Sequence, residues 1–222
     1  MKRSIMPYVL LQMLLLCTAC SDNKSSELFP LPDITVGMLA KDLSGKYPVE
    51  NLISPREHLN RALETGGVID FELTGNKFWN LACIHIDHDA RVKYLLYSRV
   101  NANFLRLFLD ESKDNKIVLE DDYLESGYDD IVKNVPLLLK HLKQQLGVSF
   151  EKKIAYLSSE NDSPCDLYIW KRGKDVVAFN HTPFDFYKKG EPFICQLTIS
   201  STYESLNGIY RSLTDSTRPN AP

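Results

Sequence analysis

The sequence predicts an α+β fold with a mostly antiparallel sheet, and three observations lead to this prediction. Two stretches, about 54–65 and 130–146, carry apolar residues at helical spacing. Short apolar or alternating stretches separated by turn sequences follow each of them. Strands therefore come in runs, which is typical of α+β folds. This order favours either two similar α+β halves or one curved sheet with two helices, and no residue-level repeat supports a duplication.

The two helices have recognisable boundaries. Ser54-Pro55-Arg56-Glu57 combines a capping serine, a proline at the first helical position and the glutamate of a capping box. Gly66-Gly67 ends this helix, and Gly147 ends the second. Pro136 lies inside the second helical pattern and predicts a kink or a restart, because proline removes a backbone donor.

The strands are predicted from alternation, apolar runs and turns. The segment 78–86 is apolar on both faces, which places it in the middle of the sheet. Arg172-Gly173-Lys174-Asp175 predicts a tight hairpin turn. A further short helix is expected over 35–43. Strands are expected at 69–73, 78–86, 92–100, 104–109, 116–119, 152–158, 165–171, 176–181 and 193–201.

The N-terminus has the pattern of a secretory signal peptide. A cationic start precedes residues 5–16, which are apolar except for Gln12. This length fits a signal peptide and is short for a membrane span, which takes about 20 residues. The small residues Thr18 and Ala19 lead directly into Cys20.

Cys20 and the small residues before it resemble the lipobox of bacterial lipoproteins, with Cys17 standing where that pattern prefers leucine. The resemblance implies cleavage before Cys20, which then carries a diacylglycerol thioether and an N-acyl chain. The alternative is an ordinary secretory signal cut near Ala19. In that family Ser21 indicates the outer membrane, so we expect a lipid-anchored domain that faces the periplasm.

Removing the signal peptide, residues 1–19, leaves enough chain for one large domain or two small ones. We expect residues 20–33 to form the lipidated cysteine and a tether, 34–213 an α+β domain, and 214–222 a disordered tail. Without Lys2 and Arg3 the chain has a net charge of −5 and no basic run. This composition argues against nucleic acid as a partner and against electrostatic adhesion to anionic lipid.

Three cysteines remain beyond Cys20, an odd number for an oxidising compartment. One disulfide and one buried thiol account for them. Cys165 and Cys195 lie at the starts of predicted strands in the same third of the chain. We therefore expect a Cys165–Cys195 disulfide, with Cys83 reduced in the core.

The sequence predicts no enzyme, catalytic residue, metal site or cofactor. Cys83, His85 and Asp87 would share one face of a strand, and these residue types can bind metal. No further ligand is identifiable, and a strand end that runs into a polar turn also explains them. Nucleophile-elbow, serine–lysine and zinc-protease motifs are absent from the sequence.

Two segments have the composition of contact surfaces. Residues 120–130 hold six carboxylates and two tyrosines. They form either a solvated loop that leads into a helix N-terminus or a recognition surface for a basic partner. The loop 182–187 carries three aromatic residues. The predicted partner-binding residues are Asp121, Asp122, Tyr123, Glu125 and Tyr128.

The sequence therefore predicts an envelope lipoprotein that acts by binding a protein. Its format of lipid anchor, short tether, compact acidic domain and no catalytic signature resembles periplasmic immunity lipoproteins, which occlude a toxin delivered by neighbouring bacteria. The alternative is a general structural or ligand-binding envelope lipoprotein, with an enzyme less favoured.

Overall fold

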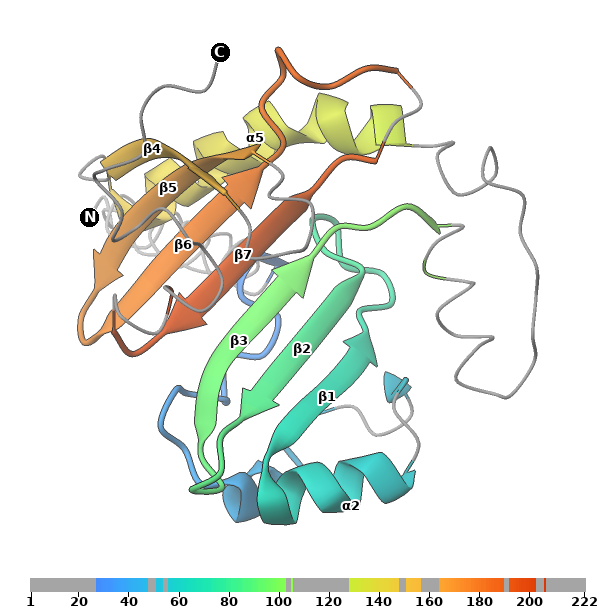
Figure 1. Ribbon diagram of the computed structural model, residues 1–222, viewed down its shortest axis with the longest axis vertical. Helices are drawn as coiled ribbons and strands as arrows, with labels where there is room; N and C mark the ends of the chain where they lie inside the picture. The colour runs from blue at the N-terminus through green and yellow to red at the C-terminus, as the bar shows by residue number, and fades with distance from the viewer. Residues whose placement is uncertain are drawn as a thin grey trace, which may run out of the picture.

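The fold is built on one seven-stranded antiparallel sheet, which confirms the α+β class (Figure 1). The computed structural model describes residues 27–47, 51–53, 56–102, 105, 128–147, 151–156, 164–189, 192–202 and 206. Its named elements are η1 (Ala40–Leu43), α2 (Arg56–Thr65), β1 (Gly67–Glu72), β2 (Leu81–Ile86), β3 (Val92–Ser98), α5 (Tyr128–Leu146), β4 (Glu151–Tyr156), β5 (Pro164–Arg172), β6 (Asp175–His181) and β7 (Cys195–Ser200).

The strand order shows one sheet built from two consecutive groups of strands. The order is β1-β2-β3-β7-β6-β5-β4, and each neighbouring pair is antiparallel. Helix α2 precedes the meander β1–β3, and α5 precedes the meander β4–β7. Each half places its first strand at an outer edge and its last strand in the middle, where β3 pairs with β7. The single sheet is thus made of two helix-plus-meander halves.

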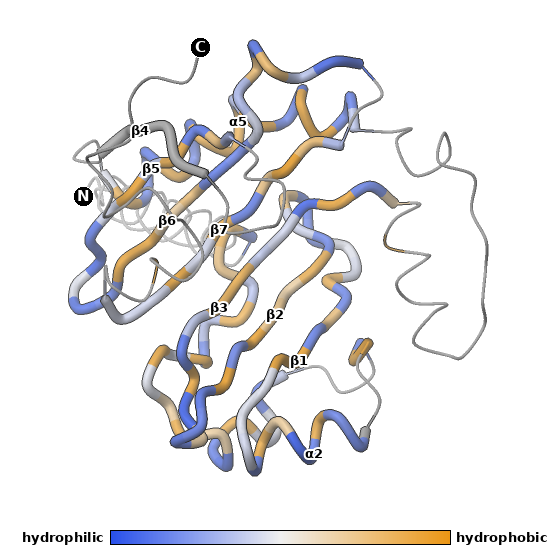
Figure 2. Tube along the Cα trace, in the orientation of Figure 1, coloured by the Kyte–Doolittle hydropathy of each residue, from blue (hydrophilic) through white to orange (hydrophobic). Residues whose placement is uncertain are grey.

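One face of the sheet carries the main core. Paired residues point to the same side of a sheet, so the row Tyr97, Leu197, Phe179 and Tyr168 lies on this face. Hydrophobic positions run along the strands, whereas the β5–β6 turn is hydrophilic (Figure 2). Helix α5 buries one stripe against this core, namely Tyr128, Ile131, Val135, Leu138 and Leu142. Burial of this stripe is what holds α5 on the sheet.

The segment that leads into η1 is part of the fold, so the predicted tether boundary at residue 33 is wrong. Leu28, Phe29 and Leu31 are only 1%, 5% and 5% exposed and belong to the main core. The Trp79 indole donates to the Leu28 carbonyl at 3.1 Å. The segment bends and turns through Pro30 and Pro32, and the Ile34 amide donates to the Leu31 carbonyl at 3.2 Å. We call residues 28–36 the strap.

The strap is fixed to the sheet at both ends. At its start, the Asn76 side chain donates to the Glu27 carbonyl at 3.0 Å. After its end, the Gly37 amide donates to the Val92 carbonyl at 2.7 Å, and the Val92 amide donates to the Met38 carbonyl at 2.8 Å. The strap therefore spans the core face between two anchored points.

Several other predictions need correction in detail. The expected helix over 35–43 is confined to the 3-10 turn η1. Helix α5 is assigned as one helix through Pro136 and starts at Tyr128. Leu105 is helical, since its amide donates to the Asn101 carbonyl, so a strand beginning at 104 is wrong. Strand β2 is an inner strand but lies next to the edge strand β1. The expected strand 116–119 lies outside the described residues.

Candidate partner-binding surface

The start of α5 is where the predicted acidic surface meets the described structure. Asp121, Asp122, Tyr123 and Glu125 lie outside the described residues. Tyr128 is the first residue of α5 and is 8% exposed in the main core. Its predicted role as a partner contact is therefore revised to a packing role. Asp129 and Asp130 follow in the first turn of the helix, where its dipole favours negative charge.

The aromatic loop after β6 has a defined backbone. The Thr182 amide donates to the Ile194 carbonyl at 3.0 Å, and the Thr182 hydroxyl accepts from the Ile194 amide at 2.9 Å. Within the loop, the Phe186 amide donates to the Pro183 carbonyl at 3.0 Å. These bonds close the loop into a turn at its base and at its tip.

The tip of this loop exposes two large apolar side chains. Phe184 is 46% exposed and Phe186 is 62% exposed. On the inner side of the loop, Phe184 lies 5.0 Å from the His181 ring, and Tyr187 meets Phe193 edge-on at 5.3 Å. The loop is thus supported from within while presenting phenyl rings to solvent.

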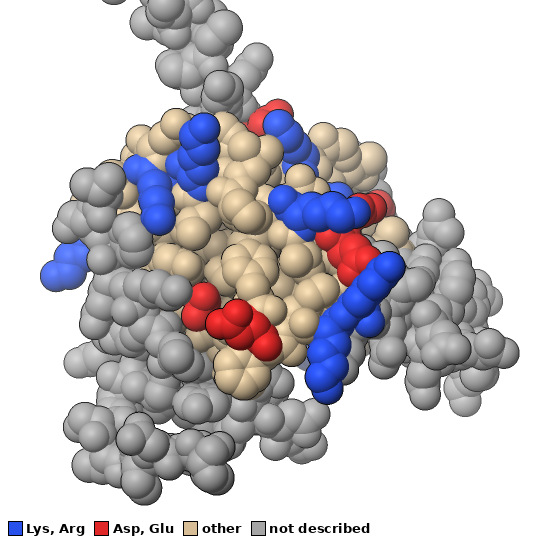
Figure 3. Space-filling model, turned by 90° about the horizontal axis from the view of Figure 1, so that it is seen from above, with Lys and Arg blue, Asp and Glu red and all other residues tan. Residues whose placement is uncertain are grey.

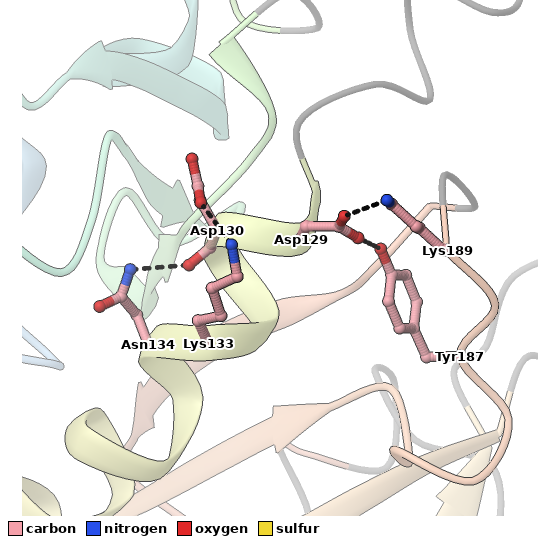
Figure 4. A network of polar contacts seen from close by, with 6 residues as sticks. All are labelled: Asp129, Asp130, Lys133, Asn134, Tyr187 and Lys189. Atoms are coloured by element: carbon pink, nitrogen blue, oxygen red, sulfur yellow. Dashed lines mark hydrogen bonds and ion pairs between the residues drawn. The ribbon is translucent and has the colours of Figure 1, made fainter.

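A short hydrogen bond joins the loop to α5. The Tyr187 hydroxyl donates to Asp129 Oδ1 at 2.5 Å, so a phenol meets a carboxylate (Figure 4). Hydrogen bonds to an ionised acceptor are about twice as strong as neutral ones. Lys189 Nζ lies 3.9 Å from Asp129 Oδ2, but its side chain is 88% exposed, so this ion pair contributes little. The Tyr187–Asp129 bond brings the two predicted contact segments together.

The surroundings of this junction are charged and solvated. Asp130 and Lys133 form an exposed pair at 3.3 Å, and the Asn134 amide donates to the Asp130 carbonyl at 2.7 Å (Figure 4). Viewed from above, separate basic and acidic groups surround uncharged side chains (Figure 3).

A buried row beside the loop contains residue types found in catalytic triads. Cross-strand pairing sets Cys195 opposite His181, and His181 opposite Asp166. His181 Nδ1 lies 2.7 Å from the Thr182 carbonyl, and Nε2 lies 3.9 Å from Asp166 Oδ2. Burial raises the pKa of Cys195 to about 12. Its sulfur is a buried thiol at neutral pH, so it lacks the accessible thiolate that nucleophilic catalysis needs. No sequence motif indicated this row, because strand pairing alone assembles it.

The predicted disulfide is contradicted by strand register. Neither Cys165 nor Cys195 forms a disulfide, and both are buried. Strand β6 lies between their strands, so the two are about 9–10 Å apart at the usual strand spacing, beyond the reach of a disulfide. They also face opposite sides of the sheet, since Cys195 belongs to the main core and Cys165 to a smaller cluster with Leu206. The sequence located both on strands but gave no information on their faces.

The residues considered for metal binding make other contacts. Burial and the neighbouring Asp70 carboxylate, which accepts a hydrogen bond from the thiol, raise the pKa of Cys83. His85 stacks on Tyr94 with ring centroids 4.6 Å apart. Asp87 Oδ1 accepts from the amides of Asp89 and Arg91. Within the described part of the chain, no three potential ligands cluster as a metal would require.

Comparison with protein-family models, with curated proteins and with solved structures returns no match for this chain. Among the helices that the structure describes, none combines the length and the hydropathy needed to cross a bilayer.

Proposed function

We propose that this chain is a lipid-anchored envelope protein that works by binding another protein. Its contact surface is the tip of loop 182–189 together with the start of α5 and the acidic stretch before it. The observation that carries this proposal is the pair of exposed phenyl rings, Phe184 and Phe186, on a loop held by the Tyr187–Asp129 hydrogen bond.

Two physical arguments support a binding role for this loop. Exposed aromatic side chains cost hydration free energy, and burying them against a partner recovers it, so they act as anchors in interfaces. A loop already fixed by hydrogen bonds loses little conformational entropy on binding. Both arguments apply to Phe186. Its side chain is 62% exposed, and the next residue, Tyr187, is held in place by its hydrogen bond to Asp129.

Among envelope binding proteins, we propose the immunity class. The lipobox-like Cys20 would place the domain on the periplasmic side of the outer membrane, where a toxin from a neighbouring bacterium arrives. The acidic carboxylates at 120–130 would attract a basic toxin surface and speed association, while the aromatic residues would slow dissociation.

The test uses the full-length chain and the product of the adjacent reading frame as the candidate toxin. Binding kinetics are measured for wild type, for a Phe184→Ala/Phe186→Ala variant, and for Val68→Ala as a control. Val68 is 44% exposed on the edge strand β1, away from the loop (Figure 1). We expect the double variant to dissociate at least about tenfold faster and the control to match wild type.

Protection of cells separates the immunity class from other binding roles. Cells that express wild type should survive the toxin, and cells that express the double variant should not. If the double variant binds and protects as well as wild type does, the loop is not the contact surface. If the adjacent product binds the chain but is harmless to unprotected cells, the chain is a binding protein of another class.

A further inference from the structure

A cavity of about 490 Å³ lies beneath the strap, on the core face of the sheet. Its walls come from three places far apart in the sequence: the strap, strands β3 and β7, and the end of the β5–β6 hairpin. This volume falls within the range of about 300–1,000 Å³ typical of small-molecule sites. The cavity is separate from the loop 182–189, which contributes no residue to it.

Most of the cavity wall is apolar. Leu31, Ile34 and Val36 line it from the strap, and Leu95 and Ile199 line it from the sheet. Leu95 and Ile199 are cross-strand partners on β3 and β7, so they form a continuous floor. An aliphatic side chain placed between floor and strap would be removed from water on both sides.

Two opposite charges line the cavity at the β5–β6 hairpin. Arg172 and Asp175 are direct cross-strand partners, so both side chains point to the face that carries the cavity. They form no ion pair with each other in the described structure, and Asp175 Oδ1 is buried with no hydrogen-bond partner. The Arg172 guanidinium instead lies over the Phe29 ring of the strap, 4.4 Å from its centroid. That stacking leaves the in-plane N–H donors of the guanidinium directed to its edges.

A third polar group lines the cavity at Tyr97. This residue is 1% exposed, and its hydroxyl has no hydrogen-bond partner. Burial raises the pKa of this hydroxyl, and the nearby Leu31 backbone amide and Arg172 guanidinium, which both belong to the cavity wall, oppose that shift. A buried polar group without a partner costs free energy that a bound polar ligand recovers.

We propose that this cavity binds a hydrophobic α-amino acid. The carboxylate pairs with the Arg172 guanidinium and the ammonium group pairs with the Asp175 carboxylate. The aliphatic side chain lies between the strap and the Leu95–Ile199 floor, and the Tyr97 hydroxyl supplies a further hydrogen bond. A neutral apolar ligand would leave both charges without partners, and a ligand of single charge would satisfy one of the two.

The test is calorimetric titration of the full-length chain with three small molecules that share the same branched aliphatic chain and differ in their charged groups. L-Leucine carries both charges, isoamylamine lacks the carboxylate, and 4-methylpentanoate lacks the ammonium group. We expect saturable one-to-one binding of L-leucine, with each singly charged probe binding about tenfold more weakly or worse, since a charged hydrogen bond is lost.

Variants assign each charge to its residue. Asp175→Asn should weaken the binding of L-leucine and isoamylamine but leave the binding of 4-methylpentanoate unchanged. Arg172→Gln should weaken the binding of L-leucine and 4-methylpentanoate but leave the binding of isoamylamine unchanged. Lys174→Gln, at an exposed position in the same turn, is the matched control and should bind as wild type does. Far-UV circular dichroism verifies that each variant is folded. The proposal is overturned if L-leucine shows no saturable binding at millimolar concentration, or if folded Asp175→Asn and Arg172→Gln variants bind it as wild type does.

Discussion

At Gly66 the chain leaves α2 and enters β1 within a single residue. The backbone there has a φ of +86°, and a Cβ atom would lie 2.6 Å from the Asp87 carbonyl oxygen. The β2–β3 hairpin and the end of α2 therefore approach each other through a position that has no room for a side chain. This contact fixes the helix against the end of the first meander.

Substitution of Gly66 should be more costly than substitution of another glycine with similar backbone. Gly75 has a φ of +77° with nothing within 4 Å of a built Cβ, so Gly75→Ala isolates the cost of the left-handed conformation. We expect Gly75→Ala to lower the free energy of unfolding by about 1 kcal/mol and Gly66→Ala by at least about 2 kcal/mol. Urea unfolding of the two variants measures the difference, and equal losses would contradict the steric argument.

His85 should make stability depend on pH. Burial, followed by the nearby Lys93 ammonium, lowers the pKa of His85 from 6.5, with Asp87 opposing. A lowered folded-state pKa means that folding favours the neutral ring. Its contribution to stability is therefore complete above about pH 6.5 and is lost as the pH falls through the folded-state value. We expect His85→Phe, which keeps a ring against Tyr94, to flatten the loss of stability between about pH 7 and pH 5. An unchanged slope in urea unfolding would show that other groups dominate.

The register of the sheet predicts free thiols. Since Cys165 and Cys195 lie on opposite faces with β6 between them, the native chain should keep both reduced. Alkylation in denaturant without reductant, followed by peptide mapping, should label both residues together with Cys83. Recovery of a peptide that links Cys165 to Cys195 would mean that the strand order is wrong.

At the scale of elements, the loop 182–189 and α5 depend on one another through Tyr187 and Asp129. Tyr187→Phe removes the hydroxyl but keeps the edge-on contact with Phe193. We expect a loss of about 1 kcal/mol in unfolding free energy and faster hydrogen exchange confined to the loop and the first turn of α5. Asp129→Asn should have a similar effect. The double variant should cost less than the sum of the two, because both substitutions remove the same bond. If the loss of unfolding free energy in the double variant equals the sum of the two single losses, Tyr187 and Asp129 are not coupled.

The elements that the sequence predicted well are those with local signals. Ile69 and Phe71 alternate with polar residues, and both face the core from β1. The strap has the sequence pattern of a tether because two prolines and polar neighbours are typical of linkers. Its burial depends on distant partners such as Trp79, and no local pattern encodes that contact. The same reason explains why the cavity beneath it was not foreseen.

At the scale of the whole molecule, the candidate surface combines a local and a non-local feature. The composition of the loop 182–187 predicts a contact segment, and the loop exposes Phe184 and Phe186. Its attachment to Asp129 depends on the packing of α5 over the second meander, and that packing has no signature in spacing. The sequence therefore indicates the two candidate segments but not the hydrogen bond that joins them.

Membrane anchoring involves the N-terminus, so it is tested on the full-length protein made in cells. If Cys20 is lipidated, mass spectrometry of the mature N-terminus should show a chain that begins at Cys20 with added acyl mass. Cys20→Ala should release the protein from the membrane fraction. A wild-type chain that starts elsewhere without modification, or a Cys20→Ala chain that still sediments with membranes, would contradict lipidation.

The position of β7 has a consequence for the order in which the protein is made. Of the seven strands that the structure describes, β7 comes last in the sequence, yet it lies at the centre of the sheet, where Leu95 pairs with Ile199 about 100 residues later. During synthesis β1–β3 and β4–β6 emerge before β7, so β3 and β6 each present an unpaired edge until residues 195–200 arrive. Such edges recruit strands from other chains. A stop codon just before residue 195 would spare six of the seven strands and still yield two open half-sheets. Residues 195–200 thus decide whether the two half-sheets join into one sheet or keep open edges.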